Sequence, residues 1–392
     1  MTERGAHAGS GARSQSPVAQ AFVPVGSVAL LVCMVALVLS AAGPTLGYDY
    51  HCYESAARAL LDGKPIYDVA FSVNVGTCPG TYTYPPAFTV AIVPWLVFGG
   101  AAALLWCLAM AASFLAGVAL LPVRRDVRWV IVIVAALDWP LLYAVKLGQV
   151  EPLLFLGFAA VWRWTDRAAV VGGVVAIGAL IKVQPALLAV WAIVTGRFRA
   201  AAVAAGIGVA AVAATTLVTG VGAWATYIDL LIRLGGQLKT PHNFAPGAVA
   251  YQAGATQEVA TAVQLASAAV AVAALLTAWR YANPELSLMV TIVASQLISA
   301  PLRDHYAVLL LLPTAWLVAR GRVWAVVFPL VGWLALGASS SWIAASSIPI
   351  AFFGCLATLL WEAVREPRAR SKQGAISAAE LASTERGAIL GE

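Results

Sequence analysis

Long apolar segments, separated by short polar or charged turns, recur along almost the whole chain and constrain its fold more than any other feature. A bilayer-crossing helix needs about 20 mostly apolar residues, and within lipid every backbone polar group must be paired internally. With 61% hydrophobic and 11% charged residues, a water-soluble surface is excluded. We therefore expect an all-α polytopic membrane protein with about 12 transmembrane helices.

The apolar segments define one predicted membrane domain over residues 21–363, between polar tails at 1–20 and 364–392 that we expect to be disordered in the cytoplasm. The segment 21–42 lacks a clean small-residue cleavage site, which favours a retained first helix over a removed signal peptide. Spans are predicted near 21–42, 100–121, 128–144, 150–163, 168–181, 184–196, 199–219, 257–281, 285–300, 304–319, 323–338 and 341–363. The two longest predicted external loops are 43–99 and 220–256.

The distribution of Arg and Lys predicts the orientation of these spans, because such residues concentrate in cytoplasmic loops. It places both termini inside the cell. A full crossing by residues 86–98 would move Arg124, Arg125 and Arg128 to the outside. We therefore expect a short interfacial helix there, opened by Pro85-Pro86. The basic helix ends favour membrane lipids as neighbours, with no nucleic-acid partner needed for the net charge of +6.

Most of the polar chemistry then faces the extracytoplasmic side. The cytoplasmic loops contain no Gly-rich phosphate-binding signature, so an activated substrate would have to arrive attached to lipid. In the loop 43–99, Asp49 directly follows the first span, where partial burial would suit a general base; the alternative is a cap for a helix beginning near Tyr53. Its neighbours Tyr50 and Glu54 are candidate substrate contacts, as is Tyr84, although Tyr84-Pro85-Pro86 also directs the chain back into the apolar layer.

Further candidates lie at the predicted outer ends of later spans. Gln149 suits either a ligand or a hydrogen bond between helices. Lys182 either extends to the membrane surface or binds a phosphate. The cluster Arg303-Asp304-His305 combines a phosphate-binding guanidinium with an imidazole that can relay protons; the alternative is an Arg-Asp pair capping a helix. His242 and Asn243, in the loop 220–256, are weaker substrate-binding candidates.

The cysteines predict a disulfide more readily than a metal site. Cys52 and Cys78 share the external loop 43–99, in an oxidising compartment, and are candidates for a bridge. Spacings typical of Cys/His metal sites are absent from the sequence, so we expect neither a metal nor a cofactor. A hard-cation site on external carboxylates remains an open alternative.

Several short blocks occur in an order that resembles glycosyltransferase family 87, over about residues 21–363. The blocks are Tyr48-Asp49-Tyr50-His51-Cys52-Tyr53 with Ala56-Ala57, Gly63 through Tyr67-Asp68, Thr83-Tyr84-Pro85-Pro86, Gly148-Gln149, Lys182 with Pro185, and Asp304-His305 before Leu310-Leu311-Leu312-Pro313. One block departs from the family, which often has Ser-Pro and Trp ahead of the late His, whereas this chain has Ser299-Ala300-Pro301-Leu302-Arg303.

The resemblance implies a GT-C-type fold with interfacial helices in the first external loop. It also implies transfer of mannose from a polyprenyl-phosphate donor to a lipid-linked or glycan acceptor, as in the polyprenol-phosphate-mannose-dependent α-mannosyltransferases of actinobacteria. Asp49 would be the catalytic base of an inverting displacement. Lys182, Arg303 and His305 would stabilise the leaving phosphate.

Other functions stay open at this point. The same fold could use polyprenyl-phosphate arabinofuranose or glucose, because sugar selection depends on a few hydroxyl contacts. A lipid-glycan transporter would need ionisable residues along a path through several spans. The predicted spans contain few besides Asp138, for which we expect a structural hydrogen bond to a neighbouring helix. A third alternative is a scaffold subunit that assists another enzyme.

Overall fold

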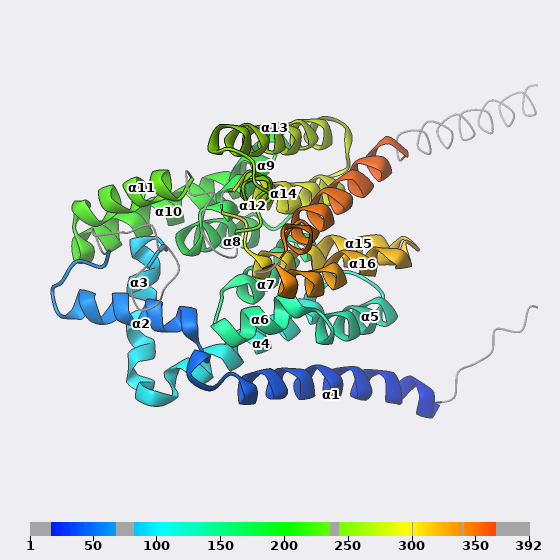
Figure 1. The fold of residues 1–392 in the computed structure, drawn as a ribbon, viewed down its shortest axis with the longest axis horizontal. Helices are drawn as coiled ribbons and strands as arrows, with labels where there is room; N and C mark the ends of the chain where they lie inside the picture. Colours follow the sequence, from blue (N-terminus) through cyan, green and yellow to red (C-terminus); the bar gives the residue numbers. More distant parts are fainter. Residues whose placement is uncertain (1–16, 68–81, 236–242, 300, 339–340, 366–392) are drawn as a thin grey trace, which may run out of the picture.

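A computed structural model describes residues 17–67, 82–235, 243–299, 301–338 and 341–365, all as helices and connecting turns with no strand in those ranges (Figure 1). The first half of the chain forms helices α1 (Pro17–Ala41), α2 (Tyr48–Leu61), α3 (Pro86–Ile92), α4 (Ala102–Leu120), α5 (Arg125–Ala136), α6 (Trp139–Leu147), α7 (Glu151–Arg163) and α8 (Ala168–Ile181), with the short 3-10 helices η1 (Gly43–Thr45) and η2 (Val93–Ala101). The helix α1 begins inside the segment 1–20 that was predicted as a tail, and Pro17 is a residue type that suits a first turn.

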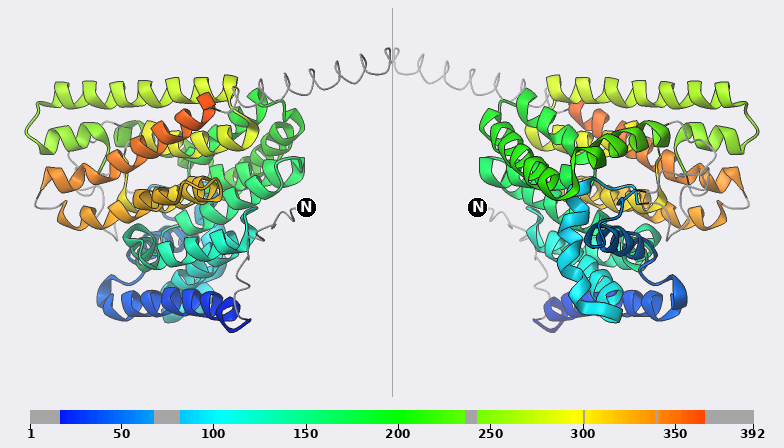
Figure 2. Two further views of the ribbon diagram at one scale, coloured as in Figure 1. Left: turned by 90° about the vertical axis from the view of Figure 1, so that its right-hand side faces the viewer. Right: turned by 90° about the vertical axis from the view of Figure 1, so that its left-hand side faces the viewer.

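The second half continues the helical pattern. It comprises α9 (Leu187–Val194), α10 (Phe198–Thr219), α11 (Val221–Gly235), α12 (Pro246–Gln252), α13 (Gln257–Tyr281), α14 (Pro284–Ile298), α15 (Leu311–Ala319), α16 (Val327–Leu330) and α17 (Trp342–Ala345), with 3-10 helices η3 (Gln184–Ala186), η4 (Asp304–Leu310), η5 (Val323–Val326) and η6 (Val331–Gly337). The helices α1 and α13 lie at opposite edges of the bundle in all three ribbon views (Figure 2).

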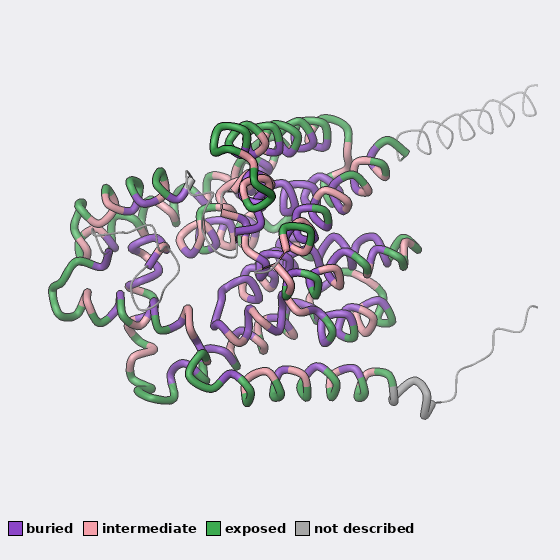
Figure 3. The backbone as a smooth tube through the Cα atoms, in the orientation of Figure 1, coloured by how far each residue is buried: buried purple, intermediate pink, exposed green. Residues whose placement is uncertain are grey.

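The central helices are mostly buried, whereas α1, α10 and α13 expose much of their length (Figure 3). The exposed side chains on these outer helices include Leu37, Val209, Leu217 and Leu265. Exposed apolar residues all along a helix are expected where lipid replaces water as the solvent. The chain is therefore a membrane protein with an all-helical bundle.

Five of the described helical stretches are long and apolar enough to cross a membrane, or up to six if α5 and α6 count as one bent span. The five are Val23–Ala41, Pro86–Leu120, Phe198–Thr219, Gln257–Tyr281 and Trp342–Arg365. Other apolar helices, such as α8 and α14, are shorter. The predicted number of about 12 spans stays a prediction.

Residues 86–98 do not continue straight into the next span. The helix α3 begins at Pro86, the start expected from Pro85-Pro86. The chain then turns at Gly99, whose φ of 52° and ψ of −130° interrupt the helical path before α4. The helix α3 runs across the direction of α1 (Figures 1 and 2). Its interfacial position stays a prediction, since α3 to α4 together also form one of the five candidate spans.

The predicted span near 128–144 consists of two helices, α5 and α6, which meet at an angle of 67° and can be counted together as one bent span. The break is at Leu137 and Asp138. The side chain of Asp138 accepts a hydrogen bond from the backbone N–H of Leu141 at 3.2 Å and so caps the start of α6. Its hydrogen bond is structural, as predicted, but it is made within its own turn. This break turns α6 toward the start of α2, where its last residues reach the site described below.

The close contact between α8 and α10 depends on a glycine. A Cβ added at Gly172 would lie 2.5 Å from the backbone oxygen of Ala200 and 2.7 Å from Cβ of Val203. Both obstacles are rigid parts of α10, so a methyl group could be accommodated only by separating the two helices. The neighbouring Gly173 has nothing within 4 Å of the same position.

Replacing Gly172 by Ala is therefore expected to destabilise the fold by about 1–3 kcal/mol through overpacking. Gly173→Ala is the matched control. It should leave stability unchanged or raise it slightly, because Ala is the better helix former. Thermal unfolding of the two purified variants in detergent measures the difference, and equal unfolding temperatures would contradict this account of the contact.

Candidate active site

Two glycines at helix ends bring Asp49 and Gln149 together. Gly47 has a φ of 65° just before α2, and its backbone N–H donates to the carbonyl oxygen of Lys146 at 2.8 Å. Gly148 has a φ of 74° at the end of α6, and its carbonyl oxygen accepts from the indole N–H of Trp106 at 2.7 Å. Positive φ angles of this kind favour glycine. The start of α2 is thus attached to the end of α6, so that the next polar residues of both segments face each other.

Asp49 lies in the first turn of α2, which begins at Tyr48 and not near Tyr53 as predicted. The N-cap position is Gly47, and its helix end has no side-chain cap, so Asp49 does not have the capping role considered from the sequence. Its side chain is partly buried. The Oδ2 atom of Asp49 accepts a hydrogen bond from Nε2 of Gln149 at 2.7 Å. The structure thus leaves the carboxylate available for chemistry.

Burial raises the pKa of Asp49 above its ordinary value of 3.8, although His305, Gln149 and Lys182 act in the opposite direction. Gln149, which holds Asp49, is two residues from Glu151, and Glu151 in turn contacts Lys182 and His305. A carboxylate with a raised pKa is a stronger proton acceptor than one in water. This environment is suited to a general base.

Lys182, at the end of α8, forms an ion pair with Glu151, the first residue of α7. The two side chains are only 11% and 1% exposed, respectively. The ammonium also lies over the ring of Tyr306, 4.1 Å from the centroid, and over that of Tyr84, at 5.7 Å. Burial acts to lower the pKa of Lys182, but Glu151 and the two tyrosines raise it above its ordinary value. Lys182 therefore points inward and does not extend to the membrane surface.

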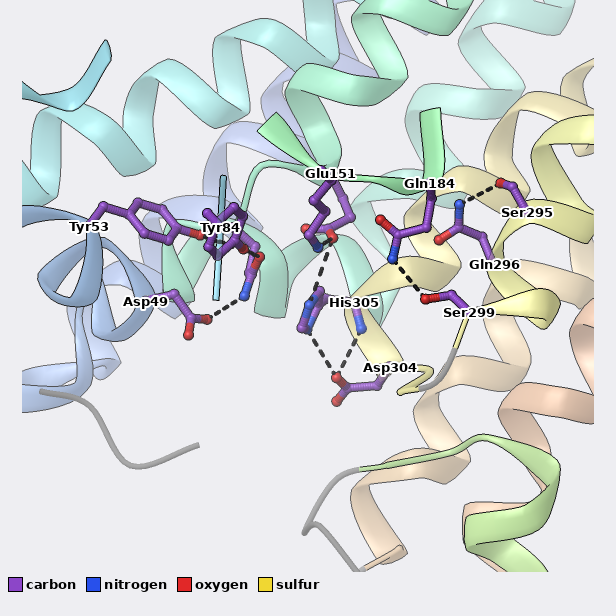
Figure 4. Close-up of polar contacts among 12 residues, drawn as sticks. Asp49, Tyr53, Tyr84, Glu151, Gln184, Ser295, Gln296, Ser299, Asp304 and His305 are labelled. Atoms are coloured by element: carbon purple, nitrogen blue, oxygen red, sulfur yellow. Dashed lines mark hydrogen bonds and ion pairs between the residues drawn. The ribbon is translucent and has the colours of Figure 1, made fainter. Parts of the chain in front are cut away.

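The His305 ring links this pair to Asp304 (Figure 4). Its Nε2 atom is 3.8 Å from Oε1 of Glu151, and its Nδ1 atom is 3.4 Å from Oδ1 of Asp304. The backbone N–H of His305 also donates to Oδ1 of Asp304 at 2.9 Å. Both side chains are at least nine-tenths buried. The predicted pair Asp304-His305 thus joins Lys182 in one charged cluster.

Neutral polar groups extend the cluster toward α14 (Figure 4). Nε2 of Gln184, in η3, donates to Oγ of Ser299 at 3.0 Å. Nε2 of Gln296 donates to Oγ of Ser295 at 2.9 Å. Amide and hydroxyl groups of this type are suited to sugar hydroxyls, since both can donate and accept hydrogen bonds. Sequence reasoning had singled out none of these four residues.

Two of the candidates from the first loop lie outside this charged cluster. The ring of Tyr50 is fully buried in an aromatic core, 5.7 Å from the ring of Trp106. The carboxylate of Glu54 is paired with Arg58 at 2.6 Å and with His51 at 3.2 Å, on the more exposed side of α2. The substrate-binding roles of Tyr50 and Glu54 stay predictions, and these contacts supply a structural account of both.

Asn243 connects the loop before α12 to the segment before η4. Its Oδ1 atom accepts from the backbone N–H of Ala245 at 3.0 Å and of Leu302 at 3.2 Å. The backbone N–H of Phe244 donates to the carbonyl oxygen of Leu302 at 2.7 Å. Asn243 thus positions the chain just before Arg303, and a substrate contact by its side chain stays a prediction.

The remaining predicted residues are placed only in part. Arg303 directly precedes η4 and is partly exposed. His242 lies outside the described residues. Cys78 does so too, so the bridge between Cys52 and Cys78 stays a prediction, while Cys33, Cys107 and Cys355 are free. The described part of the chain has no group of three or more His, Cys, Asp or Glu side chains placed to ligate a metal.

Glu151 was not among the predicted site residues, although it contacts both Lys182 and His305. A signal was available, because a lysine inside an apolar protein needs an opposite charge nearby. Glu151 lies at the predicted outer end of the span 150–163, and Lys182 directly follows the predicted outer end of the span 168–181. A carboxylate at the start of an apolar segment thus indicated Glu151 as the partner of Lys182.

Comparison with known proteins identifies the family of this chain. A family model described as glycosyltransferase family 87 matches residues 82–301. The chain belongs to glycosyltransferase family 87. The protein is therefore an enzyme, and the transporter and scaffold alternatives give way to a glycosyltransferase in the membrane. This confirms the family that the sequence blocks resembled.

A curated relative of this family 87 enzyme comes from Mycobacterium tuberculosis (strain CDC 1551 / Oshkosh). It is named polyprenol-phosphate-mannose-dependent alpha-(1-2)-phosphatidylinositol pentamannoside mannosyltransferase, and it is 30% identical over 311 residues, covering 74% of this chain and 70% of the relative. No solved structure matches the chain. The matched family range contains Gln149, Glu151 and Lys182, whereas Asp49 and His305 flank it and are joined to it by the fold.

Proposed function

We propose that this family 87 enzyme transfers mannose from a polyprenyl-phosphate donor to a lipid-linked or glycan acceptor on the extracytoplasmic face. One observation supports it above the others: the partly exposed carboxylate of Asp49 is hydrogen-bonded at 2.7 Å to Gln149, two residues before the Glu151 that contacts Lys182 and His305. A base beside cationic groups is the combination that a reaction with a leaving phosphate needs. The name of the mycobacterial relative supports the donor class.

The proposed reaction is a single inverting displacement. Asp49 accepts the proton of the acceptor hydroxyl as its oxygen attacks the anomeric carbon of the donor sugar. The bond from that carbon to the phosphate oxygen breaks as the new glycosidic bond forms. The polyprenyl phosphate leaves with the electron pair, and the proton is left on Asp49. The Oδ1 atom of Asp49 has no hydrogen-bond partner among the described residues, so it is the atom we assign to the acceptor proton.

Lys182, Arg303 and His305 are the proposed stabilisers of the leaving phosphate. Lys182 and His305 are oriented by the surrounding structure through Glu151, Asp304 and the ring of Tyr306. Preorganised charges of this type lower the cost of developing negative charge. Arg303 directly precedes the cluster, and its planar guanidinium suits two hydrogen bonds to one phosphate.

The proposed orientation places this site outside the cytoplasm, with both termini inside and about 12 spans. The charge distribution along the sequence supports it. The helix α3, which crosses the direction of α1, supports an interfacial helix in the first loop. The donor and the acceptor would both reach the site along the membrane, since each is attached to lipid or to a cell-envelope glycan.

The direct test is incubation of the purified protein with radiolabelled polyprenyl-phosphate mannose and a membrane lipid extract. A new labelled glycolipid, absent without the protein, is the expected product. Parallel reactions with polyprenyl-phosphate arabinofuranose and polyprenyl-phosphate glucose compare the three donors. A preference for either of the other two would refute mannose as the sugar, and no transfer from any of the three would refute the donor class.

The same assay across pH tests the environment of Asp49. A general base works only when ionised, so the rate should fall as the pH drops through the pKa of that group. Because burial raises the pKa of Asp49 above 3.8, the midpoint of the acid limb of kcat/KM is expected above that value. A midpoint at or below 3.8 would be inconsistent with this carboxylate acting as the base.

A further inference from the structure

The side chain of Gln149 is hydrogen-bonded on both of its polar atoms. Its Nε2 atom donates to Oδ2 of Asp49 at 2.7 Å. Its Oε1 atom accepts from the hydroxyl of Tyr84 at 2.7 Å and more weakly from that of Tyr53 at 3.4 Å. Gln149 is only 6% exposed, so neither atom can exchange its partner for bulk water. The amide of Gln149 thus connects the tyrosine hydroxyls to the carboxylate of Asp49.

Behind Gln149, the two tyrosines form a directed chain of hydroxyls. The hydroxyl of Tyr53 donates to that of Tyr84 at 2.8 Å, and the two rings pack edge to face at 4.8 Å. The hydroxyl of Tyr67 donates to the backbone carbonyl oxygen of Tyr84 at 2.7 Å. Tyr84 also packs against Phe88, with ring centroids 5.1 Å apart. Its hydroxyl is therefore fixed in place by several independent contacts.

The direction of this chain determines which end of the amide faces Asp49. A primary amide has one accepting oxygen and one donating nitrogen, so an oxygen that receives the proton of Tyr84 leaves only the nitrogen for the carboxylate. An ionised carboxylate accepts hydrogen bonds and cannot donate them. The flipped amide would place two oxygens against each other, which is unfavourable in a buried site.

We propose that Tyr84, supported by Tyr53, is a positioning residue that keeps Gln149 oriented with its amide nitrogen on Asp49. It acts through Gln149 and not on the substrate. The hydrogen bonds from Tyr53 through Tyr84 and Gln149 keep Oδ2 of Asp49 occupied and leave its Oδ1 atom for the acceptor hydroxyl. This inference rests on the proposed role of Asp49 as the base, and it assigns to the Tyr-Pro-Pro segment a function beyond directing the chain into the membrane.

The same row of hydrogen bonds also favours the charged form of Asp49. Burial raises the pKa of this carboxyl, and the hydrogen bond from Gln149 is one of the groups that lower it. Without the hydroxyl of Tyr84, Oε1 of Gln149 would keep only the longer contact with Tyr53, so the amide would be held less firmly and its bond to Asp49 would weaken. The carboxyl would then take up its proton at a higher pH, and the acid limb of the pH profile would move upward.

Tyr84→Phe tests the proposal, because it keeps the ring beside Lys182 and removes only the hydroxyl. We expect kcat to fall at least tenfold, KM for the polyprenyl-phosphate sugar to stay within twofold, and the acid limb of kcat/KM to shift to higher pH. The matched control is Tyr82→Phe, whose hydroxyl donates to the carbonyl oxygen of Pro85 at 3.1 Å. The control should keep both the rate and the acid limb of the unmodified enzyme.

The outcomes separate this inference from the proposed function. An Asp49→Asn variant without activity, together with a Tyr84→Phe variant that keeps its rate and acid limb, would overturn the positioning role and leave the base in place. Transfer by Asp49→Asn would overturn both. A Tyr84→Phe variant with an unchanged kcat and a KM raised tenfold would show a substrate contact and so refute positioning.

Stability is measured in parallel by thermal unfolding. If Tyr84→Phe unfolds at a much lower temperature than Tyr82→Phe, the test passes to Tyr53→Phe, which leaves the hydroxyl of Tyr84 without its donor. An upward shift of the acid limb of kcat/KM in Tyr53→Phe would support the positioning role of the two tyrosines. An unchanged acid limb together with an unchanged kcat would overturn that role.

Discussion

Replacing Asp49 by Asn is expected to remove glycosyl transfer while the protein stays folded. Removal of a general base typically costs about 10²–10⁴-fold in rate. Asn has nearly the same shape as Asp, and its amide oxygen can still accept from Nε2 of Gln149, so the contact between α2 and the end of α6 is retained. The measurement is transfer from labelled polyprenyl-phosphate mannose, with thermal unfolding as the test of folding.

The matched control is Asp62→Asn at the other end of α2. Asp62 is an exposed residue that pairs with Lys64 at 2.9 Å, and loss of an exposed pair changes stability by less than about 1 kcal/mol. This variant should transfer sugar at the rate of the unmodified enzyme. Turnover by purified Asp49→Asn close to that of the control would refute the assignment of the base.

The second large effect is expected at the buried pair of Lys182 and Glu151. Lys182→Met leaves the carboxylate of Glu151 buried without its cation, and breaking such a pair costs about 3–5 kcal/mol. The double variant Lys182→Met with Glu151→Gln removes both charges and should recover most of that stability. Transfer should stay about 10²–10³-fold below normal in the double variant, because the proposed phosphate-binding charge is still missing.

Thermal unfolding and transfer assays on both single variants and the double variant form a complete cycle. Lys64→Met is the control for a surface lysine, since the pair of Lys64 with Asp62 is exposed. Recovery of full transfer together with stability in the double variant would show that the pair only supports the fold. Donor use that does not change in Lys182→Met would remove Lys182 from the proposed phosphate site.

Much of the site could be predicted because polar residues are conspicuous in an apolar chain. Asp49, Gln149, Lys182 and His305 were recognised from the cost of placing such groups near lipid, and the structure brings all four together. The direction of Lys182 could not be predicted. Both an inward and an outward lysine satisfy the sequence, and only the position of Glu151, on a different helix, makes the inward one favourable.

Two further polar residues bind backbone groups that the sequence pattern did not identify as their partners. Asn243 stays a candidate for substrate binding, and its side chain accepts hydrogen bonds from the backbone of Ala245 and Leu302. The expected single span near 128–144 is bent, because Asp138 caps a new helix start. In each case a short polar side chain binds backbone groups, a competition that sequence patterns only partly reveal.

By itself, the sequence determined the class of protein, the helical architecture and the family, because these depend on the hydropathy of each segment and on the order of short blocks. Only the tertiary structure decided which polar groups meet. Helices that are apolar on nearly all sides contain no strong signal for the face that points inward. That choice is made by close packing, as at Gly172 against Ala200, and by the pairing of buried charges, as at Glu151 and Lys182.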